Sequence, residues 1–178
     1  MLDLHDNKIQ GKIPTSIEFL ASLNVLDLSV NNISGSVPES LGRLTTLNKL
    51  ILNWNYITGL TPKSLGQCKD LQFLDISSNR IYGLIPDEMG DLQGLDIMLN
   101  LSWNSLSGPI PERFSKFSKL VNLDLSHNMK ECFAQVTNVQ ASRLNKRNSG
   151  RNAVFHVVIS VSIAASFMLL GILLVIQA

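Results

Sequence analysis

Three sets of residues recur at a fixed spacing along the chain and are its main candidates for binding chemistry. The first set is Asp3, Asp27, Ile51, Asp75, Asn100 and Asp124; the second is His5, Ser29, Asn53, Ser77, Ser102 and Ser126; the third is Asp6, Val30, Trp54, Ser78, Trp103 and His127. Carboxylates, amides and hydroxyls bind partners through hydrogen bonds. An exposed Trp belongs to the residue types most enriched among interface hot spots. These residue types therefore indicate recognition of a partner.

Residue patterns typical of catalysis are not found in the sequence. It has no glycine-rich phosphate loop, no His-Arg-Asp or Asp-Phe-Gly stretch, and no room for a kinase domain. His5, His127 and His156 lie far apart in the repeat and do not have the spacing of metal ligands. The formal net charge of +1 does not point to nucleic acid. We expect no catalytic residues, no metal, no cofactor and no nucleic-acid partner.

One repeated motif, L-x-[LI]-x-x-N-x-[IL]-x-G-x-[IV]-P, places the three sets along the chain. Its best copy runs from Leu74 to Pro86. The Asn column consists of Asn7, Asn31, Asn55, Asn79, Asn104 and Asn128, so the step is 24 residues, except for one step of 25. A fixed period in this range predicts a solenoid rather than a globular domain.

Each part of the motif predicts one part of a coil. The alternation of apolar and polar residues from Leu26 to Ser29 predicts a short strand, which pairs with the next coil in a parallel sheet. The Asn amide should bond backbone groups of adjacent coils. The Gly four residues later should supply positive φ or a close approach, and the segment after Pro should form a short helical or 3₁₀ turn. The extra residue near Ile97 predicts a bulge at the strand entry.

The longer motif LxLxxNxLxGxIPxxLGxL, carried by residues 26–44, resembles the plant-specific leucine-rich repeat of receptor-like kinases and receptor-like proteins. The resemblance covers residues 1–128, with about five full copies and a broken sixth. Residues 95–120 resemble the last repeats of receptor kinases that sense peptide hormones. The resemblance implies an arched α/β solenoid with a parallel sheet on the concave face and 3₁₀ turns on the back. It also implies that a peptide or steroid hormone binds the inner face and that a co-receptor docks near the C-terminal repeats.

The candidate partner-binding residues follow from this placement on the concave face, where we expect all three sets to face solvent. They are Asp27, Ser29, Ile51, Asn53, Trp54, Asp75, Ser77, Ser78, Asn100, Ser102, Trp103, Asp124 and His127. The aspartates and serines follow the LDLS pattern of the family, which favours a framework role, whereas Trp54 and Trp103 depart from it and favour partner contact. Asn32 and Asn100 begin N-glycosylation sequons. A glycan on Asn100 would stand on the concave sheet and obstruct binding there.

A different kind of sequence follows the repeats of residues 1–128. Residues 129–152 are polar, mildly basic and without a period, which predicts a juxtamembrane linker. Residues 153–176 contain no Asp, Glu, Lys or Arg. As a helix this segment would measure about 36 Å, enough to cross a hydrocarbon core of about 30 Å, so we predict one transmembrane helix. Cys68 should be buried, and it lies too far along the solenoid from Cys132 for a disulfide.

The sequence therefore predicts a membrane-anchored recognition module of a plant cell-surface receptor at the plasma membrane. Its repeats would be extracellular and would bind a peptide ligand or a co-receptor protein. The family's capping units and kinase are missing, which suggests a truncated receptor-like kinase. One alternative is part of a full receptor serine/threonine kinase whose catalytic domain is missing here. Another is a tail-anchored cytosolic interaction protein, because the basic residues Arg143, Lys146, Arg147 and Arg151 all precede the apolar segment.

Overall fold

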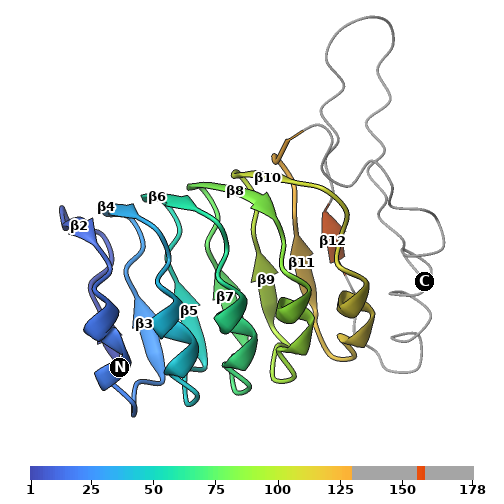
Figure 1. Ribbon diagram of the computed structural model, residues 1–178, viewed down its shortest axis with the longest axis horizontal. Helices are drawn as coiled ribbons and strands as arrows, with labels where there is room; N and C mark the ends of the chain where they lie inside the picture. The colour runs from blue at the N-terminus through green and yellow to red at the C-terminus, as the bar shows by residue number, and fades with distance from the viewer. Residues whose placement is uncertain (130–155, 159–178) are drawn as a thin grey trace, which may run out of the picture.

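The repeated motif folds into a row of similar coils in the computed structural model, which describes residues 1–129 and 156–158 (Figure 1). A typical coil contributes one strand to a large sheet, a second short strand, and a 3₁₀ helix that begins after its proline. The strands of both sheets pair in parallel with the equivalent strands of neighbouring coils. The predicted solenoid with a parallel sheet and short 3₁₀ turns is confirmed.

Two parallel sheets and a row of 3₁₀ helices make up the described part of the chain. The larger sheet contains, in spatial order, β1 (Leu2–Asp3), β3 (Val25–Asp27), β5 (Lys49–Ile51), β7 (Phe73–Asp75), β9 (Met98–Asn100), β11 (Asn122–Asp124) and β12 (His156–Val158). The second sheet contains β10 (Ser105–Ser107), β8 (Arg80–Leu84), β6 (Tyr56–Gly59), β4 (Asn32–Gly35) and β2 (Gln10–Lys12). The helices are η1 (Thr15–Phe19), η2 (Glu39–Arg43), η3 (Lys63–Gln67), η4 (Asp87–Asp91) and η5 (Glu112–Lys116). Figure 1 shows the helices along the lower side of the view and the second sheet along the upper side.

The second sheet, whose strands lie between the Asn and Gly columns or extend up to one residue past the Gly, was not predicted from the motif. The strand β4 shows why it forms. Ile33 is buried, while Asn32 and Ser34 on either side of it are exposed, which is the alternation of a strand with one buried face. Because the next coil repeats this pattern, the two segments pair in parallel.

An asparagine ladder joins successive coils. In Asn31, Nδ2 donates hydrogen bonds to the carbonyl oxygens of Leu4 (2.9 Å) and Leu28 (3.2 Å). Its Oδ1 accepts one from the amide of Ile9 (2.9 Å). Equivalent bonds are made by Asn55, Asn79, Asn104 and Asn128. The ladder thus satisfies backbone groups at the corners of two neighbouring coils, which would otherwise be buried at considerable cost.

The extra residue of the longer repeat is absorbed at the entry to β9, as predicted. In a regular coil two successive amides donate to one carbonyl, as they do at Asn24. After the longer repeat the two bonds go to different residues. Val121 donates to the carbonyl of Asp96 (3.0 Å), and Asn122 donates to that of Ile97 (3.2 Å). The strands β7, β9 and β11 are then back in register.

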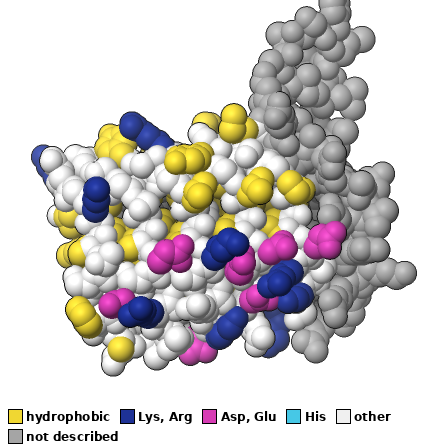
Figure 2. All heavy atoms as spheres, viewed as in Figure 1, with side chains coloured by type: hydrophobic (Ala, Val, Ile, Leu, Met, Phe, Trp, Pro, Cys, Tyr) yellow, Lys and Arg dark blue, Asp and Glu magenta, His cyan; other side chains and the backbone are white. Residues whose placement is uncertain are grey.

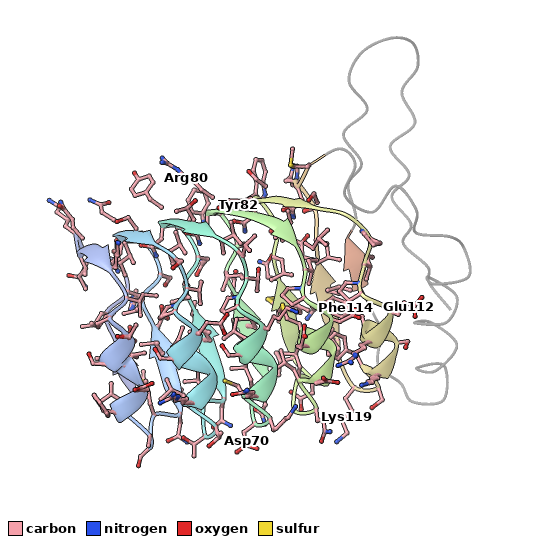
Figure 3. The ribbon with its side chains drawn as sticks, in the orientation of Figure 1. Asp70, Arg80, Tyr82, Glu112, Phe114 and Lys119 are labelled. Carbon is pink, nitrogen blue, oxygen red and sulfur yellow. The ribbon has the colours of Figure 1, made fainter. Side chains whose placement is uncertain are left out.

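Stacked apolar side chains form one continuous core inside the coils. Leu26, Leu50, Leu74, Leu99 and Leu123 occupy the same column and are completely buried. Cys68 is also completely buried, as predicted, and its burial raises the pKa of the thiol to about 11. Cys132 lies outside the described residues. Figure 3 shows Phe114 on η5, where its ring packs at a centroid distance of 4.9 Å from Phe117.

The structure describes three residues of the predicted membrane helix, and these three are not helical. His156–Val158 form β12, which pairs in parallel with β11. A strand added beside β11 satisfies backbone groups at the sheet edge. The rest of the predicted helix, and the linker beyond Met129, lie outside the described residues. None of the helices in the described ranges is long and apolar enough to cross a bilayer.

Candidate recognition surface

The first set of recurring residues forms a row across the outer face of the larger sheet. In β3, Leu26 is fully buried, whereas Asp27 lies on the opposite face and is half-buried. The same half-buried position is occupied by Ile51, Asp75, Asn100 and Asp124. The side chains of this row are therefore accessible, although each is flanked closely by its neighbours in adjacent coils.

The second set is largely buried, which corrects the expectation that it faces solvent. Ser29, Ser77 and Ser102 have exposed fractions of 8%, 4% and 3%. Side chains two residues earlier explain this burial. Asp27 Oδ1 accepts hydrogen bonds from Ser29 Oγ (2.6 Å) and from its backbone amide (2.9 Å), and Asn100 Oδ1 accepts the same pair from Ser102. These serines support the ends of their strands. Asn53 of the same set is half-buried, and the exposed member is His5, which is not among the candidate binding residues.

The third set lies on a turn with unusual backbone geometry. All six members have φ between 51° and 56°, a left-handed conformation that costs a non-glycine residue about 1 kcal/mol or more. Backbone hydrogen bonds to the next coil hold the turn, such as those from Trp54 to Ser77 (3.2 Å) and from Trp103 to Ser126 (3.0 Å). The side chains consequently project from the surface, with exposed fractions of 64% for Trp54 and 58% for Trp103. Sequence reasoning missed this geometry because Trp and Val are not typical of positive φ.

Trp103 is held in place by an aromatic stack. Its ring lies 3.8 Å from the ring of His127 in the following coil, at an interplanar angle of 16°. Offset or parallel stacking of this kind contributes about 0.5–1.5 kcal/mol beyond burial of area. Trp103 therefore presents a fixed orientation to a partner.

Asp75 lies near the middle of the row formed by the first set, which we call the acidic row because four of its six members are Asp. Burial raises the pKa of its carboxyl group, and the nearby charge of Asp124 acts in the same direction. Hydrogen bonds from the Ser77 amide (2.9 Å) and from Asn100 Nδ2 (3.3 Å) oppose the shift. The ionised form of Asp75 thus lowers the stability of the folded protein relative to a fully solvated carboxylate.

Replacing Asp75 by Asn is expected to change how stability depends on pH. A carboxyl group whose pKa is raised on folding binds its proton more tightly in the folded state, so it favours folding below its unfolded-state pKa and loses that contribution as pH rises through the folded-state pKa. The unfolding free energy of the Asp75→Asn variant minus that of the wild type should therefore be larger at neutral pH than in acid. Urea unfolding of both proteins between about pH 3 and about pH 7 measures this. A difference that stays constant, or grows in acid, would contradict it.

The sequence analysis predicts no metal site, but three side chains that could bind a metal ion lie close together in the structure. Asp3, His5 and Asp27 bring one ligand atom each within 4.8 Å of one another. A hydrogen bond between His5 Nδ1 and Asp3 Oδ1 (2.7 Å) accounts for the proximity of two of them. This bond raises the pKa of His5 and lowers that of Asp3. The cluster spans the first two coils, and two of its three members are exposed.

A second exposed surface, over β6 and β8, was missed by sequence reasoning. Tyr56, Leu60, Tyr82 and Leu84 have exposed fractions of 48%, 59%, 50% and 62%. The Arg80 guanidinium lies 4.8 Å from the centroid of the Tyr56 ring. Figure 3 shows Arg80 and Tyr82 projecting from the upper edge, where Figure 2 shows hydrophobic side chains, while acidic and basic side chains gather over the helices. Its signal in the sequence is Leu60 and Leu84, each of which directly follows the Gly column.

The two glycosylation candidates lie in different surroundings. Asn32 is exposed at the start of β4. Asn100 is half-buried on the larger sheet, where its Nδ2 donates to Asp75 Oδ2 at 3.3 Å. A glycan on Asn100 would share Nδ2 with that bond and crowd the sheet face, whereas one on Asn32 would disturb no hydrogen bond described for its side chain.

Comparison with known protein families decides the assignment of the fold. The model of the leucine rich repeat matches residues 1–57 and 45–106, and a second leucine-rich-repeat model matches residues 97–117. The chain belongs to the leucine-rich-repeat family. No curated protein matches this leucine-rich-repeat chain.

Solved structures similar to this leucine-rich-repeat chain include plant receptor ectodomains. The ectodomain of the Arabidopsis thaliana receptor kinase GASSHO1/SCHENGEN3, in complex with CASPARIAN STRIP INTEGRITY FACTOR 2, is 40% identical, with a TM-score of 0.70 over 71% of this chain and 15% of that one. The Arabidopsis HAESA ectodomain with its peptide hormone IDA is 38% identical, with a TM-score of 0.70 over 72% of this chain and 22% of that one. A chain of the Arabidopsis thaliana BIR3–SERK2 complex is 33% identical, with a TM-score of 0.63 over 76% and 71%.

The leucine-rich repeats of this chain are thus similar to plant receptor ectodomains that bind peptides or co-receptors. The chain spans only 15% and 22% of the first two ectodomains. The candidate recognition surface of this chain consists of the turns that carry Trp54 and Trp103 and of the acidic row beside them.

Proposed function

We propose that this chain is a recognition module of a plant cell-surface receptor and that it binds a peptide or a co-receptor protein through the face of the larger sheet. The observation that carries this proposal is the pair of exposed indoles, Trp54 and Trp103, on an otherwise small or polar turn. Large rigid aromatic side chains dominate the binding energy of many interfaces. The similarity to the HAESA ectodomain, which was solved with a peptide hormone, supports the same role.

We further propose that residues 153–176 anchor the module in the plasma membrane as a single span, with the repeats outside the cell. The length and the lack of Asp, Glu, Lys and Arg in this segment support the span. If β12 persists in the membrane-bound protein, the 18 residues after Val158 remain for the helix, near the lower limit of about 17. The alternative is a cytosolic, tail-anchored protein, which the basic residues before the segment favour. Sugar on Asn32 would distinguish the two, since only the extracellular arrangement permits it.

The parent protein would be a receptor-like kinase, in which this chain supplies recognition and no catalysis. The similarity to the ectodomains of GASSHO1/SCHENGEN3 and HAESA supports this relationship, because both are receptor kinases. The alternative is that this chain is part of a full receptor serine/threonine kinase whose catalytic domain is missing here. In both cases the repeats of this chain supply recognition.

Selection of peptides tests the proposal directly. A phage-displayed library of random dodecapeptides is selected on the full chain, and the recovered peptides are synthesised and titrated. We expect binding that weakens by about tenfold or more in the Trp54→Ala/Trp103→Ala variant. The control Lys63→Ala changes an exposed residue on η3 and should leave the affinity unchanged. Recovery of no binding peptide, or of peptides that bind the double variant equally well, would overturn the proposal.

A further inference from the structure

The stack between Trp103 and His127 defines which way the open face of the indole points. The two residues occupy the same position in successive coils, and their rings are nearly parallel at a centroid distance of 3.8 Å. The ring normal of Trp103 therefore runs along the solenoid axis. One face of its indole covers His127, so the other face is directed back toward the preceding coil, which carries Ser78.

Ser78 is a small residue in the coil between those of Trp54 and Trp103. Backbone hydrogen bonds place the coils of Trp54, Ser78 and Trp103 directly next to one another: Asn55 donates to the Ser78 carbonyl (3.3 Å), and Asn79 donates to that of Trp103 (3.2 Å). With about 4.8 Å between neighbouring strands, the Trp54 and Trp103 backbones lie about 10 Å apart. A planar group that stacks on an aromatic ring needs about 3.5 Å on each side. This backbone spacing leaves room above Ser78 for one planar group between the two Trp-bearing turns. We call Trp54, Ser78 and Trp103 the indole slot.

The three recurring sets carry acidic but no basic side chains, while the exposed Lys49 and Arg80 of the slot's coils lie outside these sets. The acidic members are Asp3, Asp6, Asp27, Asp75 and Asp124. The carboxylate closest in the chain to Ser78 is that of Asp75, whose Oδ1 accepts a hydrogen bond from the backbone amide of Ser77. That bond turns the carboxylate toward the end of the strand, where the turn with Ser78 begins. A planar group in the slot would therefore meet aromatic faces and a half-buried carboxylate together.

We propose that the indole slot binds the guanidinium group of an arginine side chain from a basic peptide segment of the partner. A guanidinium is planar, stacks on Trp and pairs with a carboxylate, whereas the rounder and more strongly hydrated ammonium of Lys stacks less well. A neutral ring would fill the slot but would leave the acidic row unmatched. This inference rests on the proposed function and specifies the chemistry of the partner.

Nuclear magnetic resonance of the indole groups tests the proposal. The chain contains two Trp residues, so its two indole Nε1–H signals report on the slot alone. The isotope-labelled full chain is titrated with the capped peptide Gly-Arg-Gly-Arg-Gly and with versions in which Lys or Glu replaces Arg. We expect both indole signals to shift saturably with the Arg peptide, with about threefold or more weaker binding of the Lys peptide and no saturable shift with the Glu peptide.

A substitution that fills the slot provides the matched test. Ser78→Trp places a third indole where the same left-handed turn already accepts Trp in two other coils. We expect it to weaken binding of the Arg peptide by about tenfold or more, while Ser78→Ala, which leaves the slot open, changes the affinity by less than about twofold. Retained backbone amide signals check the fold of both variants. Equal affinity of the two variants, or no shift of the wild-type indoles, would overturn the proposal.

Other outcomes separate this proposal from the proposed function. Saturable shifts with cellohexaose but not with the Arg peptide would overturn the proposal and assign the slot to carbohydrate. If library peptides depend on Trp54 and Trp103 but lack arginine, and the Arg peptide causes no shift, the arginine proposal fails while the recognition function stands. If the Arg peptide occupies the slot but no library peptide depends on the two Trp residues, the recognition function fails instead.

Discussion

Replacing Asn55 by Leu is expected to lower the free energy of unfolding by about 4 kcal/mol. The side chain of Asn55 is 7% exposed and joins two coils. Its Nδ2 donates to the carbonyls of Leu28 (2.9 Å) and Leu52 (3.1 Å), and its Oδ1 accepts from the amide of Ile33 (2.9 Å). Leucine has a similar size but makes none of these bonds, so the amide of Ile33 would be buried without an acceptor.

The matched control for this variant is Asn7→Leu. Asn7 occupies the same column but is exposed, and its side chain bonds carbonyl groups of its own coil. Water can replace those bonds, so we expect a loss below about 1 kcal/mol. Urea unfolding followed by circular dichroism measures both values. Similar losses in the two variants would show that the asparagine ladder does not join the coils energetically.

Replacing Gly66 by Ala is expected to destabilise the protein by about 3 kcal/mol. A Cβ atom at Gly66 would lie 2.2 Å from the carbonyl oxygen of Glu88 and 2.8 Å from its carbonyl carbon. Both are backbone atoms of the next coil, so no side-chain rotation relieves the overlap. The coils that carry η3 and η4 would have to separate, which weakens the packing of the core between them.

Gly11→Ala separates this steric effect from the conformational one. A Cβ at Gly11 has no atom within 4 Å, but the residue has a φ of +95°. The expected loss is therefore limited to the cost of a left-handed backbone, about 1 kcal/mol. Differential scanning calorimetry of both variants gives the comparison. A smaller loss for Gly66→Ala than for Gly11→Ala would contradict the close packing of η3 against η4.

The motif was sufficient to predict the large sheet, the 3₁₀ turns and the burial of Cys68. Each depends on a column that repeats with the same physical role in every coil, so errors at one copy are corrected by the others. The second sheet was missed because its strands, such as Asn32–Gly35, are short and lie between the conspicuous Asn and Gly columns. Whether such a stretch becomes a strand is decided by the neighbouring coil and not by its own sequence.

The recognition surface was less predictable than the fold. Alternation along a strand correctly places Asp27 outside, but it also places Ser29 outside, and the hydrogen bonds to Asp27 reverse that outcome. Local side-chain bonds of this kind override the period of the strand. The strong projection of Trp54 and Trp103 arises from the positive φ of their turn, which depends on hydrogen bonds between coils. For the same reason, the stack of Trp103 on His127 could not be read from residues 24 positions apart.

The central claim is that the repeated motif builds the scaffold while the residues between its columns recognise the partner. The most direct test is the affinity of the Trp54→Ala/Trp103→Ala variant for a library-selected peptide, measured by calorimetry on a sample whose thermal unfolding is recorded. We predict a melting temperature lowered by at most about 8 °C, because the lost Trp103–His127 stack contributes about 0.5–1.5 kcal/mol, and an affinity about tenfold or more weaker. An unchanged affinity in the folded double variant would contradict the claim.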